Sequence, residues 1–117
     1  MEISQTNHDG ATVIRLSGEI WGRTGQPEQL KAEVKKLVDA SSVRVVFNLS
    51  EVRLISSIGI GMLIGAFKAF TDAGGAMAVA EPNDPIKPVF RVLRGPFEVF
   101  ETESEAVTYV LDSSGDK

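Results

Sequence analysis

Residues 56–70 read Ser-Ser-Ile-Gly-Ile-Gly-Met-Leu-Ile-Gly-Ala-Phe-Lys-Ala-Phe, and the rest of the chain is organised around this stretch. Two hydroxyl side chains open it, three glycines follow, and no charge occurs before Lys68. A β-branched run from Val43 to Leu49 precedes it and is dense enough for a central strand. Gly74-Gly75 closes it, as glycine commonly ends a helix. The pattern predicts a largely apolar helix that begins at two serines.

These two serines have a structural interpretation and a chemical one. The first turn of a helix carries N–H groups without partners and a partial positive charge, and a serine there most often only caps them. An anion is also stabilised at this position, so a phosphoryl group on Ser57 would be tolerated and would add about −1.5 to −2 charges. Neither Ser56 nor Ser57 has Glu or Gln three residues later, so no capping box accounts for the pair.

The predicted helix is apolar on more sides than one core contact requires. It is therefore either deeply buried, or its first turns expose an apolar patch that binds another protein. Gly61 and Gly65 lie one turn apart, and we expect them to let the helix pack closely against a sheet. The apolar residues that cover nearly every direction are Ile58, Ile60, Met62, Leu63, Ile64, Phe67 and Phe70.

Toward the N-terminus, the pattern predicts a β-hairpin and then an amphipathic helix. Strands at 1–6 and 11–17 flank the turn 7–10, whose Asp-Gly pair is a strong hairpin signal and whose His8 is read as a solvated loop residue. A glycine-rich connection at 18–25 leads to a helix that starts near Pro27. Its buried stripe is Leu30, Val34, Leu37 and Val38.

Between the strand at 43–49 and the central helix, residues 50–54 are expected to be a short link. After the central helix, a buried strand is predicted at 76–80, with Asn83 or Asp84 as the cap of the next helix. Three further features are predicted: a helix over Ile86–Leu93 with an irregular first turn at Pro88, a short strand at 97–101, and a last helix introduced by the capping-box pair Thr102 and Glu105.

This order of elements predicts an α/β fold with one domain. Two antiparallel strands that lead into strand–helix alternations indicate a mixed sheet of about four to five strands flanked by about four helices. We place the domain at residues 1–112 and expect 113–117 to form a flexible C-terminal tail.

Charge and composition exclude several classes of partner. The chain has 117 residues, with 12 Lys and Arg against 16 Asp and Glu, and the basic residues are scattered. Nucleic acid or an anionic membrane surface would call for a clustered basic patch. The longest uncharged apolar run, Ile58 to Phe67, is half the length that a membrane span needs, so direct membrane insertion is not expected. The N-terminus lacks the regions of a signal peptide, and a cytoplasmic location is predicted.

The residue inventory also argues against an enzyme, a cofactor and a metal. There is no cysteine, and His8 is the only histidine, so neither a thiolate nor a multi-histidine metal site can form. Gly59-Ile60-Gly61 lacks the Lys-Ser/Thr of a phosphate-binding loop. Gly-x-Ser-x-Gly does not occur, so a catalytic serine enzyme has little beyond Ser57 in its favour.

The stretch from Phe47 to Leu63 resembles the STAS domain family, and specifically the bacterial anti-sigma factor antagonists. Supporting matches are Leu16-Ser17-Gly18-Glu19-Ile20, the Gly74-Gly75 turn and Val89-Phe90-x-x-Leu93, so that the likeness covers nearly the whole chain. The family's common pattern at its phosphorylation site is Asp-Ser-Ser/Thr-Gly-Leu-Gly. Registering the glycines places Ser57 at the phosphorylated serine, Ser56 at the Asp and Ile58 at the second hydroxyl; Ser56 is the second choice for the modified residue.

The resemblance implies partner switching. Such proteins bind, when unphosphorylated, an anti-sigma factor that is itself a serine kinase of the GHKL type, and this frees a sigma factor for transcription. The kinase phosphorylates the serine from its own ATP, and a PP2C-type phosphatase removes the mark. The residues that this resemblance assigns to partner binding are Trp21, Gly22, Ser56, Ser57, Ile58, Gly59, Ile60, Gly61 and Met62, with Ile58, Ile60 and Met62 at the edge of the docking patch.

Two questions remain open at the level of sequence. Trp21 stands where many members have Asp, and it either reshapes the partner contact or covers the edge of the sheet. The residues that break the usual motif, Ser56 and Ile58, also allow a different role: a STAS subunit of a membrane transport complex that stabilises an ATPase without being phosphorylated.

Overall fold

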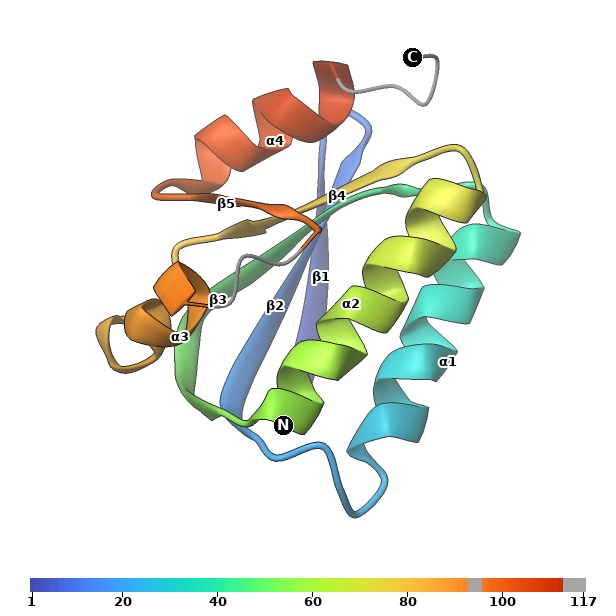
Figure 1. Ribbon diagram of the computed structural model, residues 1–117. Coiled ribbons are helices and arrows are strands. Elements are labelled where there is room, and N and C mark those ends of the chain that lie inside the picture. Colours follow the sequence, from blue (N-terminus) through green and yellow to red (C-terminus); the bar gives the residue numbers. More distant parts are fainter. Residues whose placement is uncertain (93–95, 113–117) are drawn as a thin grey trace.

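The chain folds into one five-stranded sheet with helices on both faces, as the computed structural model in Figure 1 shows. The structure describes residues 1–92 and 96–112. Within them the α/β class, the mixed sheet and the four α-helices predicted from the sequence are confirmed. The elements are β1 (Glu2–His8), β2 (Ala11–Ile20), α1 (Gln26–Asp39), β3 (Arg44–Ile55), α2 (Ser57–Asp72), β4 (Ala76–Ala80), a 3₁₀ turn η1 (Asp84–Ile86), α3 (Lys87–Val92), β5 (Glu98–Phe100) and α4 (Glu103–Asp112).

The strands lie in the sheet in their order along the chain, β1-β2-β3-β4-β5. β1 and β2 are antiparallel, whereas β2, β3, β4 and β5 pair in parallel. The hairpin turn is shorter than predicted, because Asp9 and Gly10 both have positive φ and form a two-residue turn. His8 therefore belongs to β1, where it pairs with Ala11, and is not a turn residue.

The predicted link at 50–54 is wrong, because this segment is part of β3. β2 continues past the predicted end at Ser17, and the added residues of the two strands pair as far as Ile20 with Ile55. Register shifts between Arg15 and Ser17 and between Gly18 and Glu19 interrupt the regular alternation of buried and exposed side chains. The extension delivers the chain directly to the start of α2.

Helices α1 and α2 cover one face of the sheet and α4 covers the other (Figure 1). Phe47 from β3 and Phe70 from α2 are fully buried in the larger core, under α1 and α2. The smaller core holds Val13, Val46 and alanines of β4 against Ala106 and Val110 of α4. Small side chains on that face let a single helix lie close to the sheet.

The remaining boundaries agree with the sequence in part. β4 spans the predicted residues 76–80. Asn83 caps η1, and the helix after it begins irregularly, as Pro88 predicts. Thr102 Oγ1 accepts from the N–H of Glu105 at 3.2 Å, as its capping pattern predicts. The predicted helix end at Leu93 and the predicted tail at 113–117 lie outside the described residues.

Candidate functional site

The ends of β2 and β3 and the start of α2 converge at one end of the sheet. The N–H of Ser56 donates to the carbonyl of Ile20 at 3.0 Å, so the chain turns into α2 directly beside the last residue of β2. The N–H of Ile60 then donates to the carbonyl of Ser56 at 2.9 Å and closes the first helical turn. The two predicted serines therefore lie where three elements meet.

Ser56 is the N-cap of α2, and both hydrogen-bonding roles of its hydroxyl are used. Its Oγ accepts from the N–H of Gly59 at 3.0 Å and donates to the carbonyl of Trp21 at 2.7 Å. Serine is as good a cap as aspartate, because each offers a side-chain oxygen to the first turn. The structural interpretation of the serine pair thus applies to Ser56.

Ser57 is the first residue of α2 and is exposed to solvent. Within residues 1–92 and 96–112 its hydroxyl makes no hydrogen bond. The N–H groups of Ser57 and Ile58 have no intrahelical partner by position, and the positive end of the helix dipole lies there. An anionic group on the Ser57 oxygen would therefore lie beside donors and a favourable field without disturbing the cap.

Gly59 allows α2 to approach the sheet, a role that sequence reasoning assigned to other glycines. A Cβ added to Gly59 would lie 2.8 Å from both the carbonyl oxygen of Ile20 and Cγ1 of Ile55. A Cβ at Gly61 or Gly65 would meet nothing within 4 Å, and both residues are exposed. The prediction that Gly61 and Gly65 serve close packing against the sheet is wrong; they lie on the solvent side of α2.

The loop after β2 holds Trp21 on the surface beside the serines. The residue is 40% exposed, its Nε1–H donates to Glu19 at 3.1 Å, and the guanidinium of Arg23 lies 5.1 Å from the ring centroid. Gln26 Oε1 accepts from the N–H groups of Trp21 and Gly22, at 3.0 Å each. β1 pairs with β2 only as far as Ser17, so the residues of β2 that lead to Trp21 pair with β3 alone. Both interpretations of Trp21, a partner contact and a cover of the sheet edge, therefore stay predictions.

Gln26 and Glu19 are site residues that sequence reasoning missed. The Nε2–H of Gln26 also donates to the carbonyl of Glu19 at 3.0 Å, so one side chain fixes both ends of the loop. The signal available in the sequence was a glutamine directly before Pro27, at the start of a helix that follows a glycine-rich loop.

Not all of the predicted partner-binding residues reach the surface. Ile58 is 60% exposed and packs against Gly22, where φ is +83° and an added Cβ would overlap the Ile58 side chain. Ile60 is only 4% exposed and belongs to the core, and Gly59 is buried too. The predicted edge at Ile60 is therefore wrong, because this side chain points into the sheet. Met62 is half-buried, on the side of α2 that faces α1.

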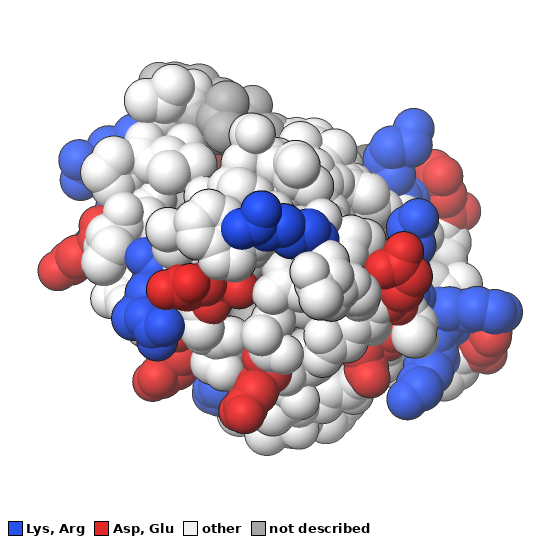
Figure 2. Space-filling view, turned by 90° about the horizontal axis from the view of Figure 1, so that it is seen from below, with Lys and Arg blue, Asp and Glu red and all other residues white. Residues whose placement is uncertain are grey.

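Charged side chains lie beside the apolar residues around Ser57, since the Arg23 guanidinium lies over the Trp21 ring and Glu19 accepts from its Nε1–H. Figure 2 views the molecule from the end where the β2–α1 loop and the start of α2 lie; a basic side chain lies in the middle of this face, with acidic side chains on either side of it and pale surface between them. The ion pair nearest to the loop joins Arg53 and Glu19 at 3.4 Å, and both side chains are exposed. An exposed pair of this kind contributes little stability. The surface suits an apolar contact with charges at its rim.

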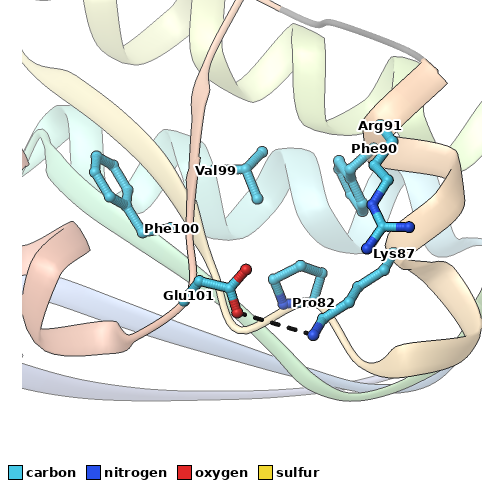
Figure 3. Close-up of a pocket in the computed structure, with 7 residues that line it drawn as sticks. All are labelled: Pro82, Lys87, Phe90, Arg91, Val99, Phe100 and Glu101. Atoms are coloured by element: carbon cyan, nitrogen blue, oxygen red, sulfur yellow. Dashed lines mark ion pairs between the residues drawn. The ribbon is translucent and has the colours of Figure 1, made fainter.

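A small pocket lies between α3 and β5, away from the serines. It encloses about 160 Å³, and its mouth carries Lys87, which is 3.8 Å from Glu101 (Figure 3). Phe90 and Val99 supply apolar lining. Within the described residues, no three His, Cys, Asp or Glu side chains cluster as a metal site would require. No described helix combines the length and the apolar character that crossing a membrane demands.

Comparisons with known proteins agree on one family. The model of the STAS domain matches residues 2–106. The anti-sigma F factor antagonist of Paenibacillus polymyxa is 25% identical over 111 residues, which cover 92% of this chain and 93% of that protein.

Solved structures share the fold at low identity. The anti-sigma factor antagonist SpoIIAA in its unphosphorylated form has a TM-score of 0.69 at 23% identity, and the alignment covers 95% of this chain and 99% of that one. The phosphorylated form of SpoIIAA from Bacillus has a TM-score of 0.68 at 23% identity, over 93% and 99% of the two chains. The murine anion transporter Slc26a9 has a TM-score of 0.66 at 12% identity; the match covers 91% of this chain and 18% of the transporter.

Proposed function

The chain belongs to the STAS domain family, and on this basis we propose that it is an anti-sigma factor antagonist whose binding to an anti-sigma factor is switched by phosphorylation of Ser57. The observation that carries the proposal is the division of roles between the two serines. The hydroxyl of Ser56 is engaged in the cap, whereas that of Ser57 is exposed at the start of α2.

In the unphosphorylated state, the anti-sigma factor binds the surface formed by Trp21, Ser57 and Ile58. Trp21 and Ile58 are two of the four large hydrophobic side chains exposed in the described part of the chain. Aromatic side chains held by a rigid backbone are common anchors of interfaces, because little entropy is lost when they bind. The Trp21 backbone is held in this way, because its N–H donates to Gln26 and its carbonyl accepts from Ser56.

Phosphorylation then acts through charge. A GHKL-type anti-sigma kinase transfers the γ-phosphoryl group of ATP to the Ser57 oxygen, with loss of the hydroxyl proton and release of ADP. The product carries about −1.5 to −2 charges beside the exposed apolar side chains of Trp21 and Ile58, in a contact where desolvating them is costly. A PP2C-type phosphatase hydrolyses the phosphoester and restores binding. The likeness of this chain to both forms of SpoIIAA supports a switch that leaves the fold in place.

The absence of the family's usual Asp is compatible with this switch. Ser56 replaces that residue as the cap of α2, and the first turn keeps its hydrogen bond to Gly59. Only the negative charge beside the phosphorylated position is lost. This role is regulatory and not enzymatic, and we place it in the cytoplasm, where sigma factors act.

The direct test combines phosphorylation and binding. The purified protein is incubated with its cognate anti-sigma kinase and ATP, and the modified residue is mapped by mass spectrometry. Ser57→Ala should take up no phosphate, and Ser56→Ala should still take it up. If Ser57→Ala accepted phosphate as well as the wild type, the site assignment would be wrong.

Measuring how the anti-sigma factor binds two Ser57 variants distinguishes the effect of side-chain charge from that of side-chain shape. Ser57→Asp should weaken binding by about tenfold or more, because it adds a charge to the contact. Ser57→Asn has nearly the same size without the charge and is the matched control; it should bind far better than Ser57→Asp. Equal binding by the two variants would refute an electrostatic switch.

The second candidate is a STAS subunit of a membrane transport complex, a role favoured by the structural likeness to the STAS-sized part of an anion transporter. In this role the protein would stabilise a transporter ATPase without being phosphorylated. Co-purification discriminates between the two, since it recovers either a small kinase or a transporter subunit.

A further inference from the structure

An apolar groove runs along the outer side of α1 and α2, and the phosphorylation switch does not use it. The groove has a volume of about 880 Å³. Its floor includes Leu30 and Val34 of α1 and Ala66 of α2, all of which are less than a tenth exposed. The two helices that line it lie side by side and run in the same direction (Figure 1).

Gly61 and Gly65 line this groove on α2 and contribute no side chains to it. Both line it, and neither has an atom within 4 Å of the position where a Cβ would be. A glycine inside a helix lowers its stability, and packing against the sheet does not explain these two. What they do leave is a strip of backbone that another helix can approach closely.

The length of the groove fits a helix of about three turns. Its lining extends from Pro27 to Asp39 on α1 and from Ile58 to Ala69 on α2. At about 1.5 Å per residue, the walls are about 16 to 18 Å long. An amphipathic helix binds such a groove through apolar side chains spaced at i, i+3 or i+4, and i+7.

The α1 wall and the α2 wall of the groove differ in charge, and this difference indicates which kind of helix would bind between them. On α1, Lys31, Lys35 and Asp39 line the groove. Lys35 Nζ lies 3.0 Å from Asp39 and is paired with it, whereas no described carboxylate lies within ion-pair distance of Lys31, so Lys31 gives this wall its net positive charge. On α2 no charged residue occurs from Ser57 to Phe67. A helix that carries acidic residues along one edge and an apolar stripe beside them is complementary to both walls.

We propose that the α1–α2 groove binds an amphipathic helix with acidic residues along one edge, supplied by the anti-sigma factor. This inference rests on the proposed function for the source of the helix. Ile58 belongs both to the surface around Ser57 and to the groove, so one partner would contact the two surfaces without a gap. The groove would then add affinity and selectivity at a place that a phosphoryl group on Ser57 does not reach.

The test uses a substitution that fills the groove with a side chain and leaves the fold intact. Gly65→Leu places a side chain in the groove, and Gly65→Ala is the matched control, since leucine and alanine are both good helix formers. The first probe is a synthetic amphipathic peptide of about four helical turns with leucines in its stripe and glutamates along one edge; the second is the same peptide with lysines in place of the glutamates. Binding is measured by fluorescence polarisation.

The glutamate peptide should bind the wild type and Gly65→Ala within about twofold of each other, and should bind Gly65→Leu at least about tenfold more weakly. Lys31→Glu should weaken the glutamate peptide and strengthen the lysine peptide. No binding of the glutamate peptide to the wild type, equal binding to Gly65→Leu, or a preference of the wild type for the lysine peptide would overturn the inference.

The same variants titrated with the purified cognate anti-sigma factor separate the two proposals. If that protein binds the wild type and Gly65→Leu equally, while Ser57→Asp weakens binding, the groove inference fails and the switch stands. If it does not bind the wild type at all, the proposed function fails, and the peptide titration still decides whether the groove accepts an acidic helix.

Discussion

Replacing Ser56 with alanine should destabilise the protein, whereas replacing its neighbour Ser57 should not. The Oγ of Ser56 makes two hydrogen bonds, one from the N–H of Gly59 at 3.0 Å and one to the carbonyl of Trp21 at 2.7 Å. The Ser57 side chain is exposed, and no described residue bonds its hydroxyl. The two adjacent serines therefore form a natural comparison within one helix turn.

The magnitude follows from these two contacts. Losing a serine N-cap costs about 1 kcal/mol. Losing the bond to the Trp21 carbonyl costs about 1 kcal/mol more, the net value of an ordinary intramolecular hydrogen bond. Ser56→Ala should thus lower the free energy of unfolding by about 2 kcal/mol, and the Tm by about 8 °C for a domain of this size. Ser57→Ala should stay within about 0.5 kcal/mol of the wild type.

The assay is urea unfolding followed by circular dichroism, with the free energy of unfolding obtained by linear extrapolation. A lower midpoint with an unchanged slope identifies a loss of stability in the native state. Ser56→Asp is the control: a carboxylate caps the helix as well as serine does and is favoured at its positive end, but it cannot donate to the Trp21 carbonyl. It should recover about half of the stability that Ser56→Ala loses, namely the part that comes from the cap.

The reasoning fails if Ser56→Ala and Ser57→Ala unfold at the same urea concentration. It fails as well if Ser56→Asp is as unstable as Ser56→Ala, because the lost stability would then not come from the cap. In either case the division of roles between the two serines would have no energetic support.

Two further predictions concern stability and use the same measurement. Gly59→Ala should lower the free energy of unfolding by about 1–3 kcal/mol, because its Cβ would lie 2.8 Å from the Ile20 carbonyl oxygen. Gly61→Ala should raise it by up to about 1 kcal/mol, because its Cβ meets nothing within 4 Å. The opposite order of stability would contradict the placement of α2 on the sheet. Glu103→Ala should lower the free energy of unfolding by about 2 kcal/mol, because the amide of the buried Asn48 loses its acceptor at 2.9 Å. Glu103→Gln keeps an acceptor and should lose less stability. Equal losses in the two variants would show that this hydrogen bond is not the cause.

The types of the elements were predictable from local patterns, but the lengths of β2 and β3 were not. The run from Val43 to Leu49 is rich in β-branched and apolar residues, and this local pattern alone predicts a strand. The rest of β3 contains Ser50, Glu51 and Arg53, and it is a strand only because the end of β2 pairs with it across two register shifts. Such pairing depends on residues about 35 positions away, and bulges hide the alternation that would signal it.

The sequence predicted a site at the start of the helix, yet it could not separate the two serines there. The difference between Ser56 and Ser57 arises from the carbonyl of Trp21, which a loop of another part of the chain brings to the helix. A similar limit applies to the glycines. Gly59, Gly61 and Gly65 look alike along the chain, and only the position of the sheet decides that the first is tightly packed and the other two face solvent.

The cap at Ser56 also explains why one end of this small domain can serve as a switch. A single hydroxyl ties the Trp21 loop to the first turn of α2, and Gly22 packs against Ile58 in the same place. The proposed partner surface and the proposed phosphorylation site therefore belong to one rigid unit. Because Ser57 itself takes no part in these contacts, a phosphoryl group there changes the charge of the surface while the contacts that shape it persist. A rigid surface with a changed charge rejects a partner without any need for the domain to unfold or rearrange.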